Sequence, residues 1–354
     1  MSNYHLENIV EPLLTWYKKN ARILPWRENT EPYRIWISEI MLQQTRVDTV
    51  ITYYKKFLQA FPTVQDLAAC EDEQLMKLWE GLGYYSRAKN LKKAAQVICD
   101  DYEGQFPTEF DIVIKLPGIG TYTAGAICSI AFGKKTAAVD GNVLRVITRL
   151  TKNSTDIMNT KFREEVKKNL EAIYPKDQCG NFTQSLMELG AVICTPNGAP
   201  KCDECPLKEY CLAYKEKCQM EFPVKKKKSE RKIENKTVFI LCYSDNIAIN
   251  KREQDGLLGG MWEFPNLDKT LSKKEVKEWL LRQKIMTAKI QSPFKKKHIF
   301  SHIEWHMNCF VVLCDSKGNN NNLKWVTRKQ LEEEIAPPTA FKKIYKEIEV
   351  NKFS

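Results

Sequence analysis

The sequence lacks any long hydrophobic run. No stretch approaches the roughly 20 consecutive apolar residues that a membrane-spanning helix requires. The N-terminal segment MSNYHLENIVEPLLTWYKKN carries charges throughout and lacks the uninterrupted apolar core of a signal peptide. An internal repeat and a long low-complexity tract are also absent. These absences argue against membrane-spanning and repeat proteins, and they predict a soluble cytoplasmic protein with no membrane partner.

What the sequence does contain is typical of a globular protein that meets nucleic acid. Its 354 residues leave room for two or three domains, and its hydrophobic content of 43% can supply packed cores. The net charge of +11 and the pI near 8.9 favour a polyanionic partner. The 12 cysteines of an intracellular protein indicate metal or redox chemistry before disulfides.

The segment from Leu116 to Leu150 contains the first strong motif. Two stretches with helical spacing, TEFDIVIKL and TYTAGAICSIAF, flank the short turn at residues 117–120. Gly118 and Gly120 free the backbone for a sharp reversal, and the next helix begins with outward N–H groups that attract a phosphate. The pattern predicts a helix–hairpin–helix that binds a DNA backbone, although an ordinary pair of antiparallel helices has the same pattern.

Two acidic residues stand out among apolar neighbours. Asp140 follows Ala-Ala-Val and precedes the helix VLRVITRL, where an Asp is by default a helix N-cap. Glu39 lies in PYRIWISEIMLQQTRVDTVITYYKKFLQAF, which has helical spacing throughout. A carboxyl in apolar company keeps its proton to a higher pH, as a general acid must. A solvated Glu on a helix face fits the same residues.

A cluster of cysteines follows the last predicted helix of residues 151–193. Four of them have the spacing C-x7-C-x2-C-x5-C, namely Cys194, Cys202, Cys205 and Cys211. Structural zinc sites usually have two C-x2–4-C pairs, and only one such pair occurs here. Ligation of a [4Fe–4S] cluster by four cysteines is the other option. Cys218 is close enough in sequence to substitute for one ligand.

The character of the sequence changes after this cluster. Residues 218–234 form a basic linker that contains the run KKKKSERK. Beyond it, TVFILCYSDNIAIN and HMNCFVVLC are strand-like, and LSKKEVKEWLLRQK between them is an amphipathic helix. We expect a helical domain over residues 1–217, with the cysteine loop at 194–211, and an α+β domain over residues 235–354.

Three motifs together resemble one family. ISEIMLQQTRV, WEGLGYYSRAKNL and the pair LPGIGTYTAGAI and AVDGNVLRV are similar to the helix–hairpin–helix glycosylases of the endonuclease III superfamily, and specifically to adenine DNA glycosylases of the MutY type. The resemblance implies an all-α glycosylase domain followed by an α+β MutT-like (Nudix) domain. It implies base excision repair of adenine mispaired with 8-oxoguanine or guanine in double-stranded DNA. The expected protein is a monomer, associated with the bacterial nucleoid through DNA binding.

The resemblance also assigns roles to individual residues. Glu39 matches the catalytic acid and Asp140 the active-site carboxylate, while Tyr122 and Asn142 are expected to order Asp140 and the sugar. The residues expected at the DNA are Gln43, Gln44 and Thr45 at the mispair, Leu82 and Tyr84 as the wedge, Gly118 and Gly120 in the hairpin, and Phe300, Ser301 and His302 at 8-oxoguanine. The superfamily carries a [4Fe–4S] cluster at the four cysteines, although its first gap usually has six residues and this chain has seven.

Two departures from related enzymes narrow the expected chemistry. The bifunctional branch has a nucleophilic Lys where this chain has Tyr122, and a phenol cannot form a Schiff base. We therefore expect a monofunctional glycosylase rather than an endonuclease III-like glycosylase/AP lyase. A non-catalytic iron–sulfur DNA-binding protein is a further alternative, which Glu39 and Asp140 argue against. The magnesium-binding REXXEEXG box of Nudix hydrolases is missing, so the second domain is expected to bind without hydrolysing.

Overall fold

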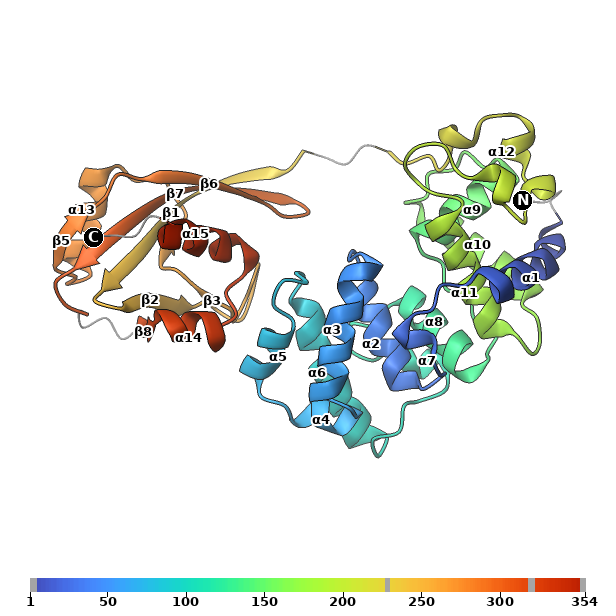
Figure 1. Ribbon diagram of the computed structural model, residues 1–354, viewed down its shortest axis with the longest axis horizontal. Helices are drawn as coiled ribbons and strands as arrows, with labels where there is room; N and C mark the ends of the chain where they lie inside the picture. The colour runs from blue at the N-terminus through green and yellow to red at the C-terminus, as the bar shows by residue number, and fades with distance from the viewer. Residues whose placement is uncertain (1–4, 227–229, 318–321, 351–354) are drawn as a thin grey trace. The chain divides into compact units, whose positions relative to one another are not determined.

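The computed structural model describes residues 5–226, 230–317 and 322–350 (Figure 1). The chain divides into two compact units, one made of Met1–Cys70 and Lys89–Lys227, the other of Glu71–Ala88 and Lys228–Ser354. Lys227, Lys228 and Ser229 of the predicted linker lie outside the described residues. In the part of the chain that is described, no helix combines the length and apolar character needed to cross a bilayer.

Helices form the first unit, as the sequence predicts (Figure 1). They are η1 (Leu6–Ile9), α1 (Val10–Asn20), η2 (Pro25–Arg27), α2 (Pro32–Leu42), α3 (Val47–Ala60), α4 (Val64–Ala69), α6 (Ser86–Asp101, whose first turn belongs to the second unit), α7 (Phe110–Val113), α8 (Thr121–Phe132), α9 (Gly141–Thr151), α10 (Thr160–Ile173), α11 (Cys179–Val192), η3 (Cys202–Glu204), η4 (Lys208–Tyr210), α12 (Leu212–Lys215) and η5 (Gln219–Glu221).

One apolar core joins the helices that carry the predicted site to the cysteine loop. Helix α11 packs against α1, α8 and α9. Leu144 and Ile147 of α9 and Phe182 of α11 are fully or almost fully buried in this core. Cys194, Cys205 and Cys211 pack against the same core from the loop. The loop and the N-terminus of α9 therefore share one rigid support.

The predicted helix–hairpin–helix is present, but its first helix is only the single turn α7. Gly118 has a φ of +76°, and a Cβ there would lie 2.6 Å from the Cβ of Asn90. This position therefore requires glycine. Gly120 has a φ of −100° and a ψ of 178°, an extended conformation open to any residue. The prediction that both glycines free the backbone is wrong for Gly120, which instead occupies the N-cap position of α8.

The predicted continuous helix around Glu39 is interrupted. Helix α2 ends at Leu42 and α3 begins at Val47, because Gln44 takes a left-handed φ of 57°. The amide of Thr45 donates a hydrogen bond of 3.2 Å to the carbonyl of Leu42, which closes the turn. Helical spacing of the apolar residues continues across this turn, and the sequence pattern therefore hides it.

The second unit contains a mixed sheet that confirms the predicted α+β class. Its strands are β1 (Lys232–Tyr243), β2 (Asn246–Lys251), β3 (Trp262–Glu263), β4 (Asn266–Leu267), β5 (Thr287–Ile290), β6 (Phe294–Ile299), β7 (Ile303–Cys314) and β8 (Lys324–Thr327). The order is β3-β2-β1-β7-β5, with β4 beside β1, β6 beside β7 and β8 beside β2. β1 and β7 are parallel, and the other pairs are antiparallel.

Alternating side chains of β1 supply two separate cores. Val238 and Ile240 face a core that includes Phe341 of α15 (Thr339–Val350) and residues of α14 (Arg328–Glu333). Phe239 and Leu241 face the opposite core against α13 (Lys273–Arg282). The sheet is thus covered on both faces. Helix α5 (Asp72–Leu78) also belongs to this unit.

Candidate active site

A cleft of about 780 Å³ opens in the first unit. Its walls come from α2 and the turn after it, the start of α8, the segment before α9, and α11. The predicted site residues that line it are Glu39, Gln43, Gln44, Thr45, Gly120, Tyr122, Asp140 and Asn142. Three distant stretches of sequence therefore converge on one cavity. Gly118 is not among the lining residues.

Glu39 is a buried carboxyl in this cleft. Helix α2 places it among buried neighbours, and the Tyr122 hydroxyl donates a hydrogen bond of 2.6 Å to its Oε2. The pKa of Glu39 is raised to about 7, chiefly by burial; the Tyr122 hydrogen bond and the charge of Arg27 oppose this rise, and the charge of Asp140 adds to it. A carboxylic acid with this pKa holds a proton that it can donate near neutral pH.

Asp140 is both an N-cap and a cleft residue. Its Oδ1 accepts a hydrogen bond of 2.8 Å from the amide of Val143, which caps α9. Its Oδ2 accepts a hydrogen bond of 2.7 Å from Asn142 Nδ2. Burial raises the pKa of Asp140, whereas both hydrogen bonds and the charge of Arg145 lower it. The cap fixes the carboxylate at the cleft wall, so the default role and the predicted role coexist.

Asn142 is in turn held by Arg145, a residue that the sequence reading did not select. Arg145 Nη2 donates hydrogen bonds of 2.9 Å to Asn142 Oδ1 and 2.7 Å to the carbonyl of Gly190. Arg145 Nε donates a hydrogen bond of 2.7 Å to the carbonyl of Cys194. A chain of hydrogen bonds therefore runs from the cysteine loop to Asp140. The feature of the sequence that indicates this chain of hydrogen bonds is an arginine on the apolar face of VLRVITRL.

The sequence also did not predict a buried ion cluster on the cleft wall. Glu188 on α11 has a side chain only 1% exposed. It accepts hydrogen bonds of 2.6 Å from Arg22 Nε and 2.8 Å from Arg27 Nη2. Burial raises the pKa of Glu188, but the hydrogen bonds from Arg22 and Arg27 outweigh it and hold the pKa at about 2. In the sequence, Glu188 lies within the apolar stretch LMELGA, just as Glu39 lies among apolar residues.

The predicted wedge residues lie in a constrained loop of the second unit. Leu82 is buried, whereas Tyr84 is 47% exposed and has a φ of 48°. Arg87 Nη2 donates hydrogen bonds of 3.0 Å to the carbonyls of both Leu82 and Gly83, and its guanidinium lies 5.7 Å from the Tyr84 ring centroid. The Tyr84 hydroxyl is 2.9 Å from Ser301 Oγ in the same unit. Tyr84 is thus the more accessible of the two wedge residues.

The predicted 8-oxoguanine-reading residues occupy the turn between β6 and β7. The amide of Phe300 donates a hydrogen bond of 2.8 Å to the carbonyl of Ile303. Ser301 and His302 are therefore the two central residues of a tight hairpin, and both are exposed. The His302 side chain is exposed at the tip, while Ser301 Oγ already has a hydrogen-bond partner in the Tyr84 hydroxyl.

The four predicted cluster ligands form one group at the end of α11. The pKa of the Cys205 thiol is raised to about 12, chiefly by burial; the Leu207 amide opposes this rise, and the charges of Cys194, Cys211 and Cys202 add to it. No three His, Cys, Asp or Glu side chains among the described residues are placed to hold a single metal ion. Four thiols are the donor set that a [4Fe–4S] cubane requires.

The two carboxyl groups define the class of site. Cleavage of a glycosidic bond requires a proton donor for the leaving group and a second carboxylate for the cationic sugar.

Residues 37–174 match the family model described as HhH-GPD superfamily base excision DNA repair protein. Residues 237–347 match the model of the NUDIX domain. These matches confirm the predicted fold of both domains.

Known proteins similar to the whole chain identify the family. The adenine DNA glycosylase of Buchnera aphidicola subsp. Schizaphis graminum is 39% identical over 88% of this chain and 89% of its own length. The adenine DNA glycosylase of Homo sapiens is 30% identical over 98% of this chain and 76% of its own length. The chain therefore belongs to the adenine DNA glycosylase family, as the sequence motifs predict.

Solved structures support the fold of the helical unit. A thermostable thymine-DNA glycosylase is 33% identical, with a TM-score of 0.55 over 59% of this chain and 96% of that protein. A non-covalent endonuclease III–DNA complex is 27% identical, with a TM-score of 0.52 over 60% of this chain and 96% of that protein.

Proposed function

We propose that this chain is a monofunctional adenine DNA glycosylase that acts as a monomer on double-stranded DNA and removes adenine mispaired with 8-oxoguanine or guanine. The observation that carries the proposal is the buried Glu39, hydrogen-bonded to Tyr122 in a cleft that Asp140 also lines. A base inside a duplex cannot reach such a cleft, so the adenine has to be flipped out of the stack.

Glu39 acts as the general acid in this proposal. Its pKa of about 7 keeps a substantial fraction protonated near neutral pH, so it can protonate N7 of the flipped adenine. Protonation converts adenine into a neutral leaving group, and the glycosidic bond breaks through an oxocarbenium-like state. After it has donated the proton, Glu39 can accept one from the incoming water.

Asp140 stabilises the cationic sugar. The amide of Val143 and the side chain of Asn142 bind the carboxylate and favour its ionised form, against the effect of burial. An ionised carboxylate in a cleft of low dielectric stabilises a nearby positive charge more strongly than it does in water. Tyr122 stands where the lyase branch has its amine nucleophile, so no imine forms with the sugar.

Selectivity comes from the opposite base, since adenine itself is undamaged. Ser301 and His302 at the exposed hairpin tip can hydrogen-bond 8-oxoguanine, while Tyr84 supports the distorted stack. The cysteines Cys194, Cys202, Cys205 and Cys211 would hold a [4Fe–4S] cluster, which supplies structural and electrostatic support for the DNA-facing loop. The chemistry at the sugar needs only residues of the cleft.

Single-turnover assays on duplexes with adenine opposite 8-oxoguanine, guanine, cytosine and thymine test the proposal. We expect adenine release from the first two, and no borohydride-trapped complex between protein and DNA. Glu39→Gln lowers the rate by about 10²–10⁴-fold, because the amide supplies no proton. The exposed Glu28→Gln in the same region is the matched control and keeps the wild-type rate.

Two results would overturn the proposal. Adenine release by Glu39→Gln within tenfold of wild type would remove Glu39 as the acid. A stable borohydride-trapped complex would favour the second candidate, a glycosylase/AP lyase, over a monofunctional enzyme.

A further inference from the structure

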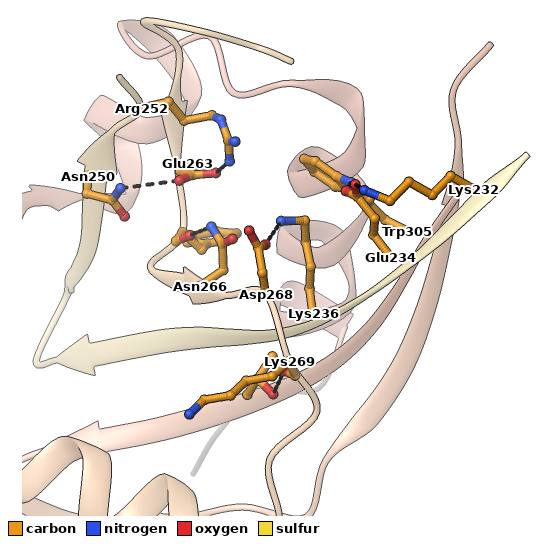
Figure 2. A network of polar contacts seen from close by, with 12 residues as sticks. Lys232, Glu234, Lys236, Asn250, Arg252, Glu263, Asn266, Asp268, Lys269 and Trp305 are labelled. Carbon is orange, nitrogen blue, oxygen red and sulfur yellow. Dashed lines mark hydrogen bonds and ion pairs between the residues drawn. The ribbon is translucent and has the colours of Figure 1, made fainter. Parts of the chain in front are cut away.

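Trp305 is a buried ring next to the turn of the hairpin formed by β6 and β7, where it pairs with His298. It is 1% exposed, and its indole N–H donates a hydrogen bond of 3.0 Å to Glu234 Oε2 (Figure 2). Glu234 is its direct neighbour in the register of β1 and β7. Lys232 Nζ lies 3.0 Å from Glu234 Oε1 and holds the other oxygen. The orientation of the indole is therefore fixed by an ion pair on the adjacent strand.

Two cations constrain the same ring. Lys236 Nζ lies 4.4 Å from the Trp305 ring centroid and the Arg252 guanidinium 5.7 Å from it. Cation–π contacts of this kind are strongest when the cation is desolvated, and the Lys236 side chain is only 3% exposed. Asp268 pairs with Lys236, and Glu263 pairs with Arg252 at 2.5 Å (Figure 2). Each cation is thus held in place by its own carboxylate.

This network is attached to the hairpin tip at two points. The Phe300 ring packs edge-on against Trp305, with ring centroids 4.8 Å apart and an interplanar angle of 70°. The amide of Lys232 donates a hydrogen bond of 3.1 Å to the carbonyl of His302. Phe300 and His302 flank Ser301, so both attachments bear directly on the predicted reading residues. Trp305 makes the first attachment and Lys232 makes the second. Glu234 binds both of these residues.

We propose that Trp305 and its ion pairs are positioning residues that set the selectivity for 8-oxoguanine, a role that rests on the function proposed above. Trp305 is buried and contacts no DNA itself. It fixes Phe300, and Phe300 fixes the angle at which Ser301 and His302 leave the sheet. Hydrogen-bond recognition depends on donor–acceptor geometry, so a tilt of this turn weakens contacts to the oxidised base. Contacts to the adenine in the other unit's cleft are untouched.

Ordinary core packing is the competing role for Trp305, and selectivity distinguishes the two. A core residue changes stability and slows all substrates alike. A positioning residue changes the ratio of rates on adenine opposite 8-oxoguanine and adenine opposite guanine. The chain offers a matched control in Trp279, which stacks on Phe239 at 4.1 Å in the core on the opposite face of the sheet.

The experiment compares single-turnover rates, duplex affinities and thermal unfolding for full-length variants. Trp305→Leu lowers the 8-oxoguanine-to-guanine selectivity by about tenfold, equivalent to 1.4 kcal/mol. Trp305→Phe keeps an aromatic partner for Phe300 and restores most of it. Glu234→Ala removes the partner of the indole N–H and gives an intermediate loss. Trp279→Leu lowers stability and leaves the ratio at its wild-type value.

Distinct outcomes separate failure of this inference from failure of the proposed function. A folded Trp305→Leu protein with wild-type selectivity overturns the inference, as does an equal change of the ratio in Trp279→Leu. If the wild-type chain releases no adenine from any duplex, the proposed function fails instead. The ratio of affinities for duplexes containing 8-oxoguanine and guanine then decides the inference by the same comparison. Should Trp305→Leu fail to fold, Trp305→Phe and Glu234→Ala decide it.

Discussion

Arg145 Nε donates a hydrogen bond of 2.7 Å to the backbone carbonyl of Cys194. The same guanidinium holds Asn142, which holds Asp140, so the first residue of the cysteine loop is linked to the proposed catalytic carboxylate through two side chains. Arginine suits this role because its planar fork donates in several fixed directions. A change in the conformation of the cysteine loop therefore shifts Asp140, the carboxylate proposed to face the sugar.

Arg145→Lys should therefore slow adenine release while retaining the positive charge. A lysine cannot reach Cys194, Gly190 and Asn142 together, and a hydrogen bond that involves a charged group contributes about 1.5–3 kcal/mol. We expect a loss of roughly 10- to 100-fold in the single-turnover rate. Arg149→Lys is the control, since Arg149 donates to the Thr195 carbonyl and to Cys194 Sγ of the loop, and to two carbonyls beyond it, but has no hydrogen bond to Asn142. A larger rate loss in Arg149→Lys than in Arg145→Lys would contradict this link.

The pH dependence of adenine release should report the ionisation of Glu39. The acid is active when protonated, so the rate is highest below its pKa and falls as the pH rises through about 7. The Tyr122 hydrogen bond lowers the pKa of Glu39, so Tyr122→Phe should shift this descending limb to higher pH. Single-turnover rates across the pH range measure the shift. A limb that moves to lower pH in Tyr122→Phe would refute the assigned effect of the phenol.

The position of Glu39 and Asp140, the proposed catalytic pair, could be predicted from sequence because each residue lies in a contiguous motif. Glu39 and Asp140 both interrupt apolar stretches, and the structure places both at the cleft. Arg22, Arg27 and Glu188 could not be paired in advance, because η2 and α11 are brought together only by tertiary packing. The turn at Gln44 was hidden since apolar spacing continues through it. Periodicity reports which face of a segment is buried, and it does not report a local change of backbone direction.

In the C-terminal unit, too, local patterns predict individual elements but not the pairing of distant ones. β-Branched and aromatic residues predict strands at 237–250 and 306–314, and amphipathic spacing predicts the helix at 271–284. The stretch predicted to be strand-like, residues 237–250, contains most of β1 and β2, separated by a turn at Ser244 with a φ of 50°. The setting of Trp305 depends on the parallel pairing of β1 with β7, two strands separated by a long stretch of sequence. No local pattern encodes that pairing.

The cysteine ligands can be tested by metal content. Purified anaerobically, the wild-type protein should contain about four irons per chain, as a Cys₄ cubane requires. Cys202→Ser should lose iron and DNA affinity together, since the ligand set is incomplete. Cys218→Ser is the control and should retain both. Stoichiometric zinc without iron would overturn the cluster assignment. Loss of iron in Cys218→Ser, with retention in Cys211→Ser, would identify Cys218 rather than Cys211 as the fourth ligand.

Glu188→Gln should destabilise the first unit. Loss of the charge leaves Arg22 and Arg27 without their buried partner, a change that typically costs about 3–5 kcal/mol. The pKa of Glu188 in the folded protein, about 2, lies below the ordinary value of 4.5. Its contribution is therefore present above pH 4.5 and is lost as the pH falls from there toward 2.

Urea unfolding of wild type and variant at pH 7 and at acidic pH measures this contribution. The difference between the two proteins should be largest at pH 7 and should shrink below pH 4.5. Glu216→Gln removes an exposed partner of Lys152 and is the matched control, expected to change stability by about 1 kcal/mol or less. Equal effects of the two substitutions would show that the Glu188 cluster contributes no more than a surface pair.

Gly190→Ala tests the close approach of α11 to the residue that holds Asp140. A Cβ at Gly190 would lie 2.6 Å from the Cβ of Asn142 and 3.2 Å from its Cα, so Asn142 has to move. Alanine is otherwise the better helix residue by about 1 kcal/mol. We expect this gain to be lost to the clash and the rate of adenine release to fall, because the bond from Asn142 to Asp140 is disturbed.

Gly141→Ala is the control for this substitution. A Cβ there meets no heavy atom within 4 Å, and Gly141 is the first residue of α9, directly after Asp140. It should keep wild-type activity and gain a few tenths of a kcal/mol in stability, up to roughly 1. Single-turnover rates and thermal unfolding of both variants complete the comparison. A Gly190→Ala protein that is more stable than wild type and equally active would show that Asn142 does not depend on the contact with α11.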